Sequence, residues 1–380
     1  MRSKAPSGHQ QSPLVLTALE DARAILLGGL KPVDPVLAPR DEALGCICAE
    51  PLIASLRPSH VTALRDGWAM RADDIAGASS YAPIFLAEKP VTIQAGDRLP
   101  PECDCVIDPH GVDDSGPMAQ VLVEGLPGEN VRRPGEDASA GQVLFAQGHR
   151  LCTTDIACAQ AMGIAALSVR RPHVAIVDSP SRDGARISVQ FLMRVLAFEG
   201  ARVTLLACAD RSAPAIQSVL AAATADLILL VGGTGSGASD HAITALEASG
   251  SVLRHGVALE PGRTAAIASV AGTPLIAVPG LFEQAFAVWL GLIAPAMERL
   301  SLRLPAKPAI LPLTRKISSR VGVAEVVLLR REGDAFAPLA IGELPMQCLC
   351  DATHAMIVEA GNEGHAGGEP VAAFALPGAQ

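Results

Sequence analysis

The spacing of apolar positions near the start of the chain predicts helices. Within residues 14–30 the apolar side chains fall on one face of a helix with about 3.6 residues per turn. These side chains are Leu16, Leu19, Ala22, Ile25 and Leu26. A second helix is predicted over Asp41–Ala54, broken at Pro51 because proline lacks the backbone N–H that a helix interior needs.

From about residue 56 to residue 138, short apolar runs alternate with glycine and proline, as in PVTIQAGDRLPPECDCVID and AQVLVEGLPGENVRRPGED. This pattern is typical of short strands. Residues 140–169 contain a turn, a short strand and the helical segment TTDIACAQAMG, whose Asp155 suits the positive end of a helix dipole. We expect residues 14–55 and 139–170 to form one discontinuous N-terminal helical and extended domain, with residues 56–138 inserted as a β-rich module.

Strand and helix patterns alternate from His173 onward. The strand segments are HVAIVDS, ARVTLLACA, DLILLVGG and TPLIAVPG, and the helical segments are VQFLMRVLAFEG, SAPAIQSVLAAATA, DHAITALEASG and LFEQAFAVWLGLIAPAMERL. This alternation predicts a three-layer α/β domain with a parallel sheet over residues 171–304. A proline-rich linker is predicted from Pro305 to Pro312. Alternating runs from Thr314 to Leu376 predict a small C-terminal β domain within residues 305–380.

The composition is that of a folded multidomain protein that does not bind nucleic acid. The 380 residues are 49% hydrophobic, which is enough for several cores. The formal net charge is −9 and no basic stripe is present, whereas nucleic-acid binding depends on neutralising phosphates. The N-terminal segment lacks the apolar core of a signal peptide, and no apolar run approaches the roughly 20 residues that span a bilayer. We expect a cytoplasmic protein with neither nucleic acid nor membrane as a partner.

The nine cysteines include three Cys-x-Cys pairs, Cys46/Cys48, Cys103/Cys105 and Cys348/Cys350. Residues two apart on a strand face the same side, so each pair has a spacing that suits soft-metal ligands. The more common interpretation is a small buried hydrophobic residue, and the Cys-x-x-Cys spacing of zinc sites is absent. A reducing compartment fits this cysteine usage best.

The strongest local signal for chemistry is VGGTGSGASDH, residues 231–241, between a predicted buried strand and a predicted helix. Its glycines leave backbone amides unshielded, and a helix N-terminus adds partial positive charge, so such loops bind phosphate. Asp240 lies where the helix is expected to begin, able to cap it or to hold a cation that bridges phosphates. The alternative is an ordinary glycine turn with an aspartate cap.

Two further segments carry charge between turn residues. LRDGWAM, residues 64–70, places Asp66 in an Asp-Gly turn, and it is either a functional carboxylate or simply a turn residue. GENVRRPGED, residues 128–137, carries two arginines and acidic residues between glycines. That composition suits anion binding or an interface salt-bridge cluster, and a solvated charged turn is the alternative.

The order of these motifs resembles the molybdopterin molybdenumtransferase family, which comprises the MoeA proteins of bacteria and the E domain of gephyrin. The resemblance extends from about residue 14 to residue 376 and includes DGWAM, IQAGDRLPPECDCVI, GENVRRPGED, ADLILLVGGTGSGASD, PGR and PLIAVPG. It implies four domains and a homodimer, with the active site between the α/β domain of one subunit and the β module of the other. It also implies that molybdate and adenylylated molybdopterin are substrates and that Mg²⁺ assists release of the adenylate.

The resemblance assigns candidate roles to individual residues. Catalytic roles are implied for Asp66, Asp137 and Asp240, and Glu136 also matches the family motif N-x-R-x-x-G-E-D. The residues implied in substrate binding are Arg132, Gly232, Gly233, Thr234, Ser236, Gly237, Arg263, Pro279 and Gly280. The residues implied in binding the metal ion are Asp210, Asp240 and Asp183.

The chain departs from the family pattern at several of these positions. Ala95 stands where the motif T-G-A-P has a hydroxyl, and Arg182 replaces the glutamate of S-T-G-D-E-L. Residues 186–188 (RIS) replace D-S-N, and Glu260 replaces a lysine. A glutamate beside an anionic substrate reduces electrostatic complementarity.

We therefore predict a transferase of molybdenum cofactor biosynthesis, which inserts molybdate into adenylylated molybdopterin with release of AMP, although several catalytic positions are substituted. The alternative is a non-catalytic molybdopterin-binding scaffold that delivers cofactor to a molybdoenzyme. An unrelated nucleotide-binding α/β enzyme is a third hypothesis. Further predicted partners are a molybdopterin adenylyltransferase and a client molybdoenzyme.

Overall fold

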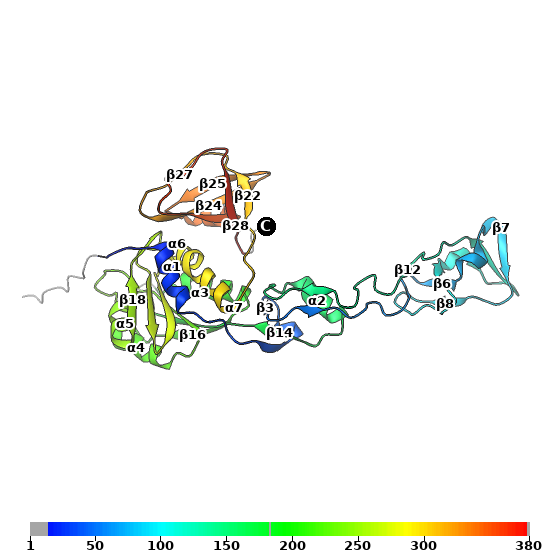
Figure 1. Ribbon diagram of the computed structural model, residues 1–380, viewed down its shortest axis with the longest axis horizontal. Coiled ribbons are helices and arrows are strands. Elements are labelled where there is room, and N and C mark those ends of the chain that lie inside the picture. The colour runs from blue at the N-terminus through cyan, green and yellow to red at the C-terminus, as the bar shows by residue number, and fades with distance from the viewer. Residues whose placement is uncertain (1–13, 182–183, 378–380) are drawn as a thin grey trace, which may run out of the picture. The chain divides into compact units, whose positions relative to one another are not determined.

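The computed structural model describes residues 14–181 and 184–377, which fall into two units (Figure 1). The larger unit draws on Met1–Glu50, Gln147–Ile156 and Ala165–Gln380, and the smaller unit on Pro51–Ala146 and Ala157–Ile164. The helix α2 (Thr153–Ala161) begins in the first and ends in the second. The chain therefore leaves the larger unit twice, after Glu50 and after Ile156, and returns to it each time.

The centre of the larger unit is a six-stranded sheet in the order β16-β15-β17-β21-β20-β18. Its strands are β15 (His173–Asp178), β16 (Arg202–Ala207), β17 (Leu227–Val231), β18 (Ser251–His255), β20 (Ala266–Val270) and β21 (Thr273–Val278). The first four in this order are parallel, as the sequence predicts. The last two are antiparallel to their neighbours, so the prediction of an all-parallel sheet is wrong at this edge.

The antiparallel edge follows from the turn between β20 and β21. Ala271 and Gly272 both have positive φ, at 50° and 83°, as a tight hairpin turn of the primed type requires. The pairing of Val270 with Thr273 leaves these two residues as the whole turn. A two-residue turn can only join antiparallel strands, and therefore β20 runs against β21.

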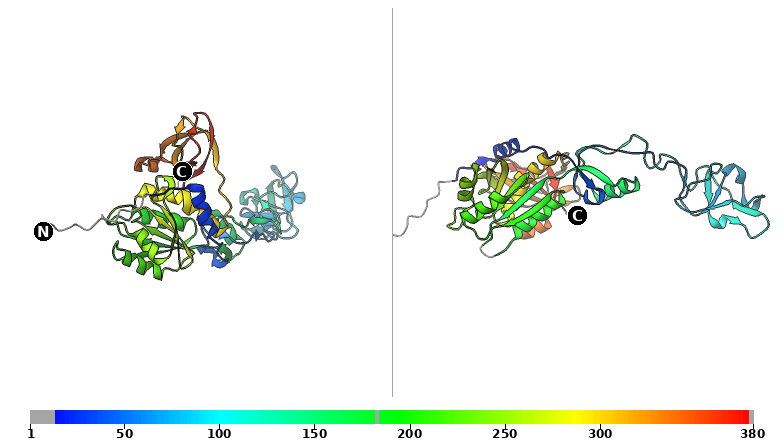
Figure 2. Two further views of the ribbon diagram at one scale, coloured as in Figure 1. Left: turned by 60° about the vertical axis from the view of Figure 1, so that its left-hand side comes forward. Right: turned by 90° about the horizontal axis from the view of Figure 1, so that it is seen from below.

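Helices cover both faces of this sheet because side chains alternate along its strands. Val174 and Ile176 pack with one set of helices, whereas Ala175 and Val177 pack with the other. Figure 2 shows helices on both sides of this sheet. The first set is α1 (Leu19–Gly28), α3 (Ile187–Phe198), α6 (Phe282–Val288) and α7 (Ala294–Ser301). The second set is α4 (Ala213–Ala222), capped by Ser212, and α5 (Ala242–Ser249). The three-layer arrangement that the sequence predicts is present.

The closing helix is interrupted. The sequence predicts one helix over residues 281–300, but a π-helical turn, η4 (Trp289–Ile293), lies between α6 and α7. Within this turn Gly291 packs so closely that an added Cβ would lie 3.0 Å from Leu259 Cδ2. Such π-turns widen a helix by one residue and turn its side chains relative to a regular helix.

The C-terminal part of the larger unit is a β domain whose sheet also includes two strands from earlier parts of the chain. Its strands are β22 (Ala309–Pro312), β23 (Ile317–Ser318), β24 (Ala324–Glu332), β25 (Ala335–Ile341), β26 (His354–Val358), β27 (Gly364–His365) and β28 (Pro370–Ala375). The short strands β1 (Thr17–Ala18) and β19 (Val257–Glu260) extend this sheet in parallel with β24. The predicted linker over Pro305–Pro312 is wrong in its second half, because β22 pairs with β28.

The predicted helix over Asp41–Ala54 is wrong. Only a 3-10 turn, η1 (Arg40–Glu42), forms there, followed by β3 (Ile47–Cys48) and β4 (Leu52–Ile53). β3 joins β2 (Val36–Pro39) and β14 (Ala166–Arg170) in a three-stranded sheet. Gly45 ends the helical pattern: its φ is 79°, and an added Cβ would lie 2.9 Å from the carbonyl oxygen of Phe198.

The smaller unit consists of short strands and 3-10 turns, which is the texture that its sequence predicts. Its strands are β4, β5 (Thr62–Ala63), β6 (Gly67–Met70), β7 (Ser79–Leu86), β8 (Val91–Ile93), β9 (Cys105–Ile107), β10 (Val112–Asp113), β11 (Ala119–Val123), β12 (Val131–Arg132) and β13 (Val143–Phe145). Its 3-10 turns are η2 (Ala72–Ile75) and η3 (Pro109–Gly111). One core of this unit centres on Met70, Ile75 and Ile107.

The cysteines are all free thiols. Burial raises the pKa of Cys48 to about 11 and that of Cys105 to about 12, so both stay protonated near neutral pH. Cys348 and Cys350 lie on the short helix α8 (Met346–Asp351), so the strand arrangement considered for that pair is wrong. Within residues 14–181 and 184–377, no group of three His, Cys, Asp or Glu side chains is placed to hold a metal ion. No helix in the same ranges is long and apolar enough to cross a membrane.

Candidate functional site

The carboxyl ends of three parallel strands lie at one level of the central sheet. Asp178 at the end of β15 pairs in register with Val231 at the end of β17, which pairs with Val278 at the end of β21. The segments that follow these three residues therefore emerge side by side. Ligands of open α/β sheets bind at this edge. The structure thus brings together the predicted residues Gly232, Gly233 and Thr234 with Pro279 and Gly280.

Glycine is needed where these segments meet. Gly232 has a φ of 94°, and an added Cβ would lie 2.9 Å from the carbonyl oxygen of Ser179. An added Cβ on Gly280 would lie 3.6 Å from the Cα of Gly232. The amide of Gly232 donates to Val278 at 2.8 Å, and the amide of Ser179 donates to Val231 at 3.1 Å. The backbones therefore approach closely, as a site that presents main-chain donors requires.

The glycine loop that follows β17 presents unused amides. Those of Gly233, Thr234, Gly235 and Ser236 donate no hydrogen bond to any residue that the structure describes. Thr234 is buried, its hydroxyl lies 3.0 Å from that of Thr264, and its carbonyl lies 3.3 Å from Nε2 of His255. Gly235 and Ser236 are more exposed. Successive free N–H groups of this kind form an anion-binding loop.

Arg211 holds the end of this loop, and the sequence analysis missed it. Its Nη2 donates to Oδ1 of Asp240 at 2.7 Å, its Nη1 to the carbonyl of Pro180 at 2.8 Å, and its Nε to the carbonyl of Ser239 at 3.2 Å. One side chain from the segment after β16 thus joins the segments after β15 and β17. The only sequence signal was its place next to Asp210.

Asp240 does not cap a helix. The helix α5 begins at Ala242, its N-cap is His241, and no side chain caps it. Instead, Oδ2 of Asp240 accepts from the amide of Gly237 at 3.2 Å, while Oδ1 accepts from Arg211. Asp240 lies two residues before the helix, too early to serve as its cap. The predicted cap is therefore wrong, and the carboxylate instead fixes the shape of the glycine loop.

A second ion pair lies at the end of β15. Asp178 is 3% exposed, and Nε of Arg186 lies 2.9 Å from its Oδ2. Burial raises the pKa of Asp178, and the charge of Arg186 opposes that rise. Ser179 is also buried, and its hydroxyl has no partner among the described residues. Ser188 donates to the carbonyl of Gly280 at 2.7 Å and so ties α3 to the same edge. Asp178 and Ser179 were not among the predicted site residues, although both follow a buried strand.

Glu260 is neutralised by arginines. Nε of Arg263 donates to its Oε2 at 2.6 Å, and Nη2 of Arg320 lies 3.9 Å from its Oε1. Arg320 is held in turn by Glu325 at 2.9 Å. Arg263, predicted to bind substrate, is thus already paired with the residue that replaces a lysine in the family pattern. The repulsion expected from Glu260 is reduced by these neighbours.

The structure describes two of the three predicted metal ligands, Asp210 and Asp240, and each has a protein partner. Asp210 is exposed, and hydrogen bonds from the Ser212 side chain and backbone lower its pKa. Asp240 is occupied by Arg211 and Gly237. Asp183 lies outside the described residues, as does Arg182. The described carboxylates at this edge are therefore each matched with a nearby donor or arginine.

The motifs of the smaller unit form their own group. Asp66 accepts from the amide of Ala95 at 2.8 Å, which places the predicted carboxylate beside the position where a hydroxyl is missing. β12 pairs with β5, so Arg132 lies opposite Thr62, which precedes Asp66 by four residues in the chain. Nη1 of Arg132 lies 3.1 Å from Oδ1 of Asp137.

The segment from Arg132 to Asp137 is closed on itself. Besides the Arg132–Asp137 pair, Oε2 of Glu136 accepts from the amide of Arg133 at 2.8 Å. The Arg132 and Asp137 side chains are about half exposed, at 44% and 48%. Surface pairs of this kind are weak and readily exchange partners, so these groups can still turn toward an anion.

The sheet edge and the glycine loop are typical of an open α/β domain that binds its ligand at the carboxyl ends of the strands, and the chain also contains a separate β-rich unit. Comparisons with known proteins specify the class further. Residues 17–163 match the model of the MoeA N-terminal region, domains I and II, and residues 187–299 match that of a probable molybdopterin binding domain.

Relatives and solved structures agree with these matches. The chain is 25% identical to molybdopterin molybdenumtransferase 2 of Mycobacterium tuberculosis, over 76% of this chain and 81% of the relative. It is 27% identical to molybdopterin molybdenumtransferase of Haemophilus influenzae, over 75% of this chain and 78% of the relative. A crystal structure of the molybdopterin biosynthesis MoeA protein of Pyrococcus horikoshii aligns with a TM-score of 0.68 at 23% identity, over 96% of this chain and 100% of that one.

This chain belongs to the MoeA family, as its motifs predicted. Its fold is a MoeA-like fold, and its α/β domain is the part that matches the model of a probable molybdopterin binding domain.

Proposed function

We propose that this chain is a molybdopterin molybdenumtransferase that inserts molybdate into adenylylated molybdopterin and releases AMP. The observation that carries the proposal is the sheet edge where β15, β17 and β21 end in register. The backbones of Gly232 and Gly280 approach closely there, and four amides of the glycine loop have no partner among the described residues. The names of the relatives from M. tuberculosis and H. influenzae support the same reaction.

The residues divide the work of such a reaction. The amides of Gly233–Ser236 offer hydrogen bonds to the phosphate of the adenylylated substrate, because they are preorganised and have no acceptor among the described residues. Arg211 keeps the loop in place through Pro180, Ser239 and Asp240. Asp178, whose pKa is raised by burial, lies beside the loop and offers a proton-exchanging group at the reacting edge.

The described residues offer no preformed magnesium site, and Asp183, the third predicted ligand, lies outside them. Of its predicted ligands, Asp240 is held by Arg211, and Asp210 is held by Ser212. A magnesium ion needs near-octahedral oxygen ligands, and no cluster of three acidic, His or Cys side chains occurs among the residues described. We derive no step through a metal cofactor. The positive charge near the loop instead comes from Arg211 and Arg186.

We further propose a homodimer and a four-domain organisation with boundaries at residues 14–55 with 139–170, 56–138, 171–304 and 305–380. The support is the family membership, which implies a site completed by Asp66, Arg132 and Asp137 of a second subunit. Sedimentation analysis at micromolar concentration tests the dimer, and a monomer there would contradict it. Cytoplasmic location, an adenylyltransferase partner and a client molybdoenzyme stay predictions from the sequence.

The comparisons do not favour a non-catalytic scaffold, because the curated relatives are named as transferases. The test is to supply purified chain with adenylylated molybdopterin and molybdate, and to follow AMP release together with formation of the molybdenum cofactor. AMP release that depends on molybdate and is lost in Gly232→Ala supports the proposal. Tight binding of adenylylated molybdopterin with no product over many hours would overturn it.

A further inference from the structure

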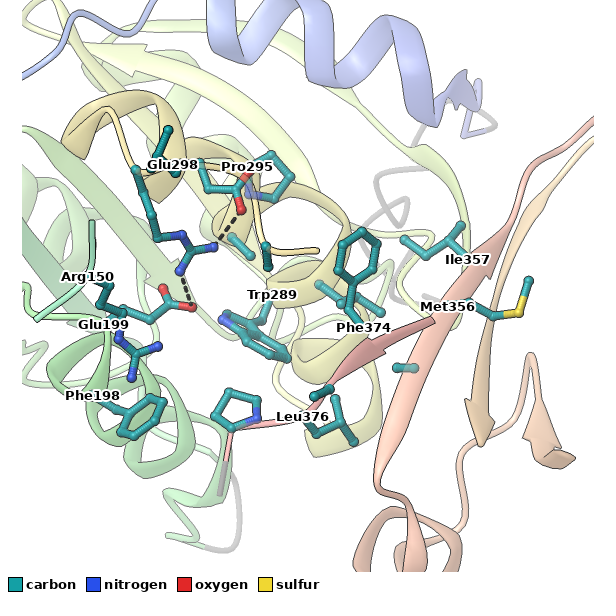
Figure 3. A pocket seen from close by; sticks show the side chains of 18 of the residues that line it. Arg150, Phe198, Glu199, Trp289, Pro295, Glu298, Met356, Ile357, Phe374 and Leu376 are labelled. Carbon is teal, nitrogen blue, oxygen red and sulfur yellow. Dashed lines mark hydrogen bonds and ion pairs between the residues drawn. The ribbon is translucent and has the colours of Figure 1, made fainter. Parts of the chain in front are cut away.

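A cavity of about 740 Å³ lies in the larger unit, and none of the predicted site residues lines it (Figure 3). Its volume is within the range of small-molecule sites. Its apolar wall comes from the end of α3, the closing helices and the C-terminal strands; the side chains include Phe198, Leu290, Ile357, Phe374 and Leu376.

Buried polar atoms without partners line the same cavity. Trp289 is 4% exposed, and its Nε1 has no hydrogen-bond partner among the described residues. Glu199 is 7% exposed, and its Oε2 also has no hydrogen-bond partner among them. In Figure 3 the indole nitrogen of Trp289 and the carboxylate of Glu199 point toward one another across the opening. Leaving such a group buried and unsatisfied is unfavourable, so a donor and an acceptor left open together indicate a missing partner.

The backbone presents Trp289 to this cavity through the π-turn η4. The turn begins at Trp289 and separates α6 from α7, and π-turns occur often at functional sites. Phe191 and Phe286 hold the indole, with ring centroids 5.8 and 5.6 Å from it. Its donor is therefore fixed in direction before any ligand arrives.

Arginine and glutamate charges balance around the cavity. Arg303 forms ion pairs with two glutamates. Its Nη1 lies 3.7 Å from Oε1 of Glu199, and its Nη2 lies 2.5 Å from Oε1 of Glu298. The guanidinium of Arg150 lies 4.0 Å from the ring centroid of Phe198. With Arg23 and Glu359, which form a pair at 3.4 Å, the lining carries three arginines and three glutamates. Above pH 7, where Glu199 is ionised, a charged ligand would upset this balance, so the cavity suits an uncharged one.

We propose that this cavity binds an uncharged planar lactam, with the carbonyl of the ligand accepting from Trp289 Nε1–H and its ring N–H donating to Glu199 Oε2. Adjacent C=O and N–H groups match a donor and an acceptor that face the same opening. The apolar wall takes the rest of the ring system. The site is separate from the glycine loop and does not depend on molybdenum transfer.

The test uses three probes of nearly the same shape: quinazolinone, its N-methyl derivative and quinazoline. Only quinazolinone has both the carbonyl and the ring N–H. The chain has two tryptophans, so in Trp68→Phe the fluorescence comes from Trp289 alone. We expect quinazolinone to give a saturable fluorescence change with one site per chain. The N-methyl derivative and quinazoline should bind roughly tenfold or more weakly, the loss that one buried hydrogen bond accounts for.

Matched variants locate the site by calorimetry. Trp289→Phe keeps an aromatic ring but removes the donor, and should weaken quinazolinone binding roughly tenfold, whereas the same change at Trp68, in the smaller unit, should leave binding unaltered. Circular dichroism confirms that each variant is folded. The proposal is overturned if wild-type protein shows no saturable response to quinazolinone, or if quinazoline binds as tightly. It is equally overturned if a folded Trp289→Phe protein binds like wild type.

Discussion

Arg211 donates a hydrogen bond to Asp240 at 2.7 Å, and this pair closes the end of the glycine loop. Both side chains are only about one-fifth exposed, at 22% and 21%. The family resemblance implied that Asp240 holds a cation. In this chain an arginine occupies that carboxylate and also holds the carbonyls of Pro180 and Ser239. The Arg211 side chain thus holds the end of the loop in shape.

Breaking this pair should loosen the loop. We expect Arg211→Gln to lower the free energy of unfolding by about 2 kcal/mol and to weaken binding of adenylylated molybdopterin, because three partly buried acceptors lose their donor. Asp240→Asn should cost less, and the double variant should show coupling of about 1–2 kcal/mol in a mutant cycle. Urea unfolding measures the stabilities and calorimetry the binding. Arg254→Gln, at an exposed arginine, is the control. Additive effects of the two changes would show that the pair does not act as a unit.

Two glycines of the same sheet separate backbone strain from close approach. Gly232 and Gly272 have similar φ values of 94° and 83°, but an added Cβ meets the Ser179 carbonyl at 2.9 Å in the first and nothing within 4 Å in the second. Gly272→Ala should cost about 1–2 kcal/mol of stability from its left-handed backbone alone. Gly232→Ala should cost clearly more and should abolish substrate binding. Equal losses of stability and binding in both variants would contradict the geometry assigned to the site.

Removing divalent cations with a chelator tests whether substrate binding depends on a metal ion at Asp240 and Asp210. Because the carboxylates of Asp240 and Asp210 already have protein partners, treatment with EDTA should change the affinity for adenylylated molybdopterin by less than about twofold. Calorimetry with and without added Mg²⁺ provides the measurement. A large gain in affinity on adding Mg²⁺ would restore the cation that the sequence predicted at this edge.

Glu199 should make the stability of the larger unit depend on pH. Burial raises its pKa from 4.5 to about 7, while Arg303 and Arg150 oppose that rise and Glu298 adds to it. The pKa of Glu199 is higher in the folded state than in the unfolded state. The stability that this residue contributes is therefore fully present below about pH 4.5 and is lost as the pH rises through 7. The loss is on the order of 3 kcal/mol.

Glu199→Gln should remove this dependence, because the amide does not ionise. Urea unfolding from pH 5 to pH 8 should show the stability of wild type falling relative to the variant across that window. Glu247→Gln, at an exposed position on α5, is the matched control and should follow wild type. Parallel curves for wild type and Glu199→Gln would refute the raised pKa.

The local sequence pattern predicted the positions of helices and strands better than it predicted which strands and side chains contact one another. The strands β15, β16, β17 and β21 and the helices between them were predicted because each is a continuous apolar or amphipathic run. The pairing of β19 with β24 joins Leu259 to Ala324, and nothing in the local pattern of either segment specifies such a distant partner. Likewise the glycine loop was visible as a motif, but Arg211 was not, since its three acceptors lie in segments brought together only by folding.

We expect the chemical step to be impaired more than substrate binding. The loop amides and Arg263 remain, whereas Ala95 lacks the hydroxyl of the family motif next to Asp66. A group that acts only in the transition state affects turnover rather than affinity. Ala95 is exposed, so Ala95→Thr fits without repacking and should raise the rate of molybdenum insertion about tenfold, with binding of adenylylated molybdopterin changed less than about twofold. Ala95→Val has the same shape without the hydroxyl and should stay at the wild-type rate. If Val raises the rate as much as Thr, or if Thr changes affinity and not rate, the missing hydroxyl is not what limits the reaction.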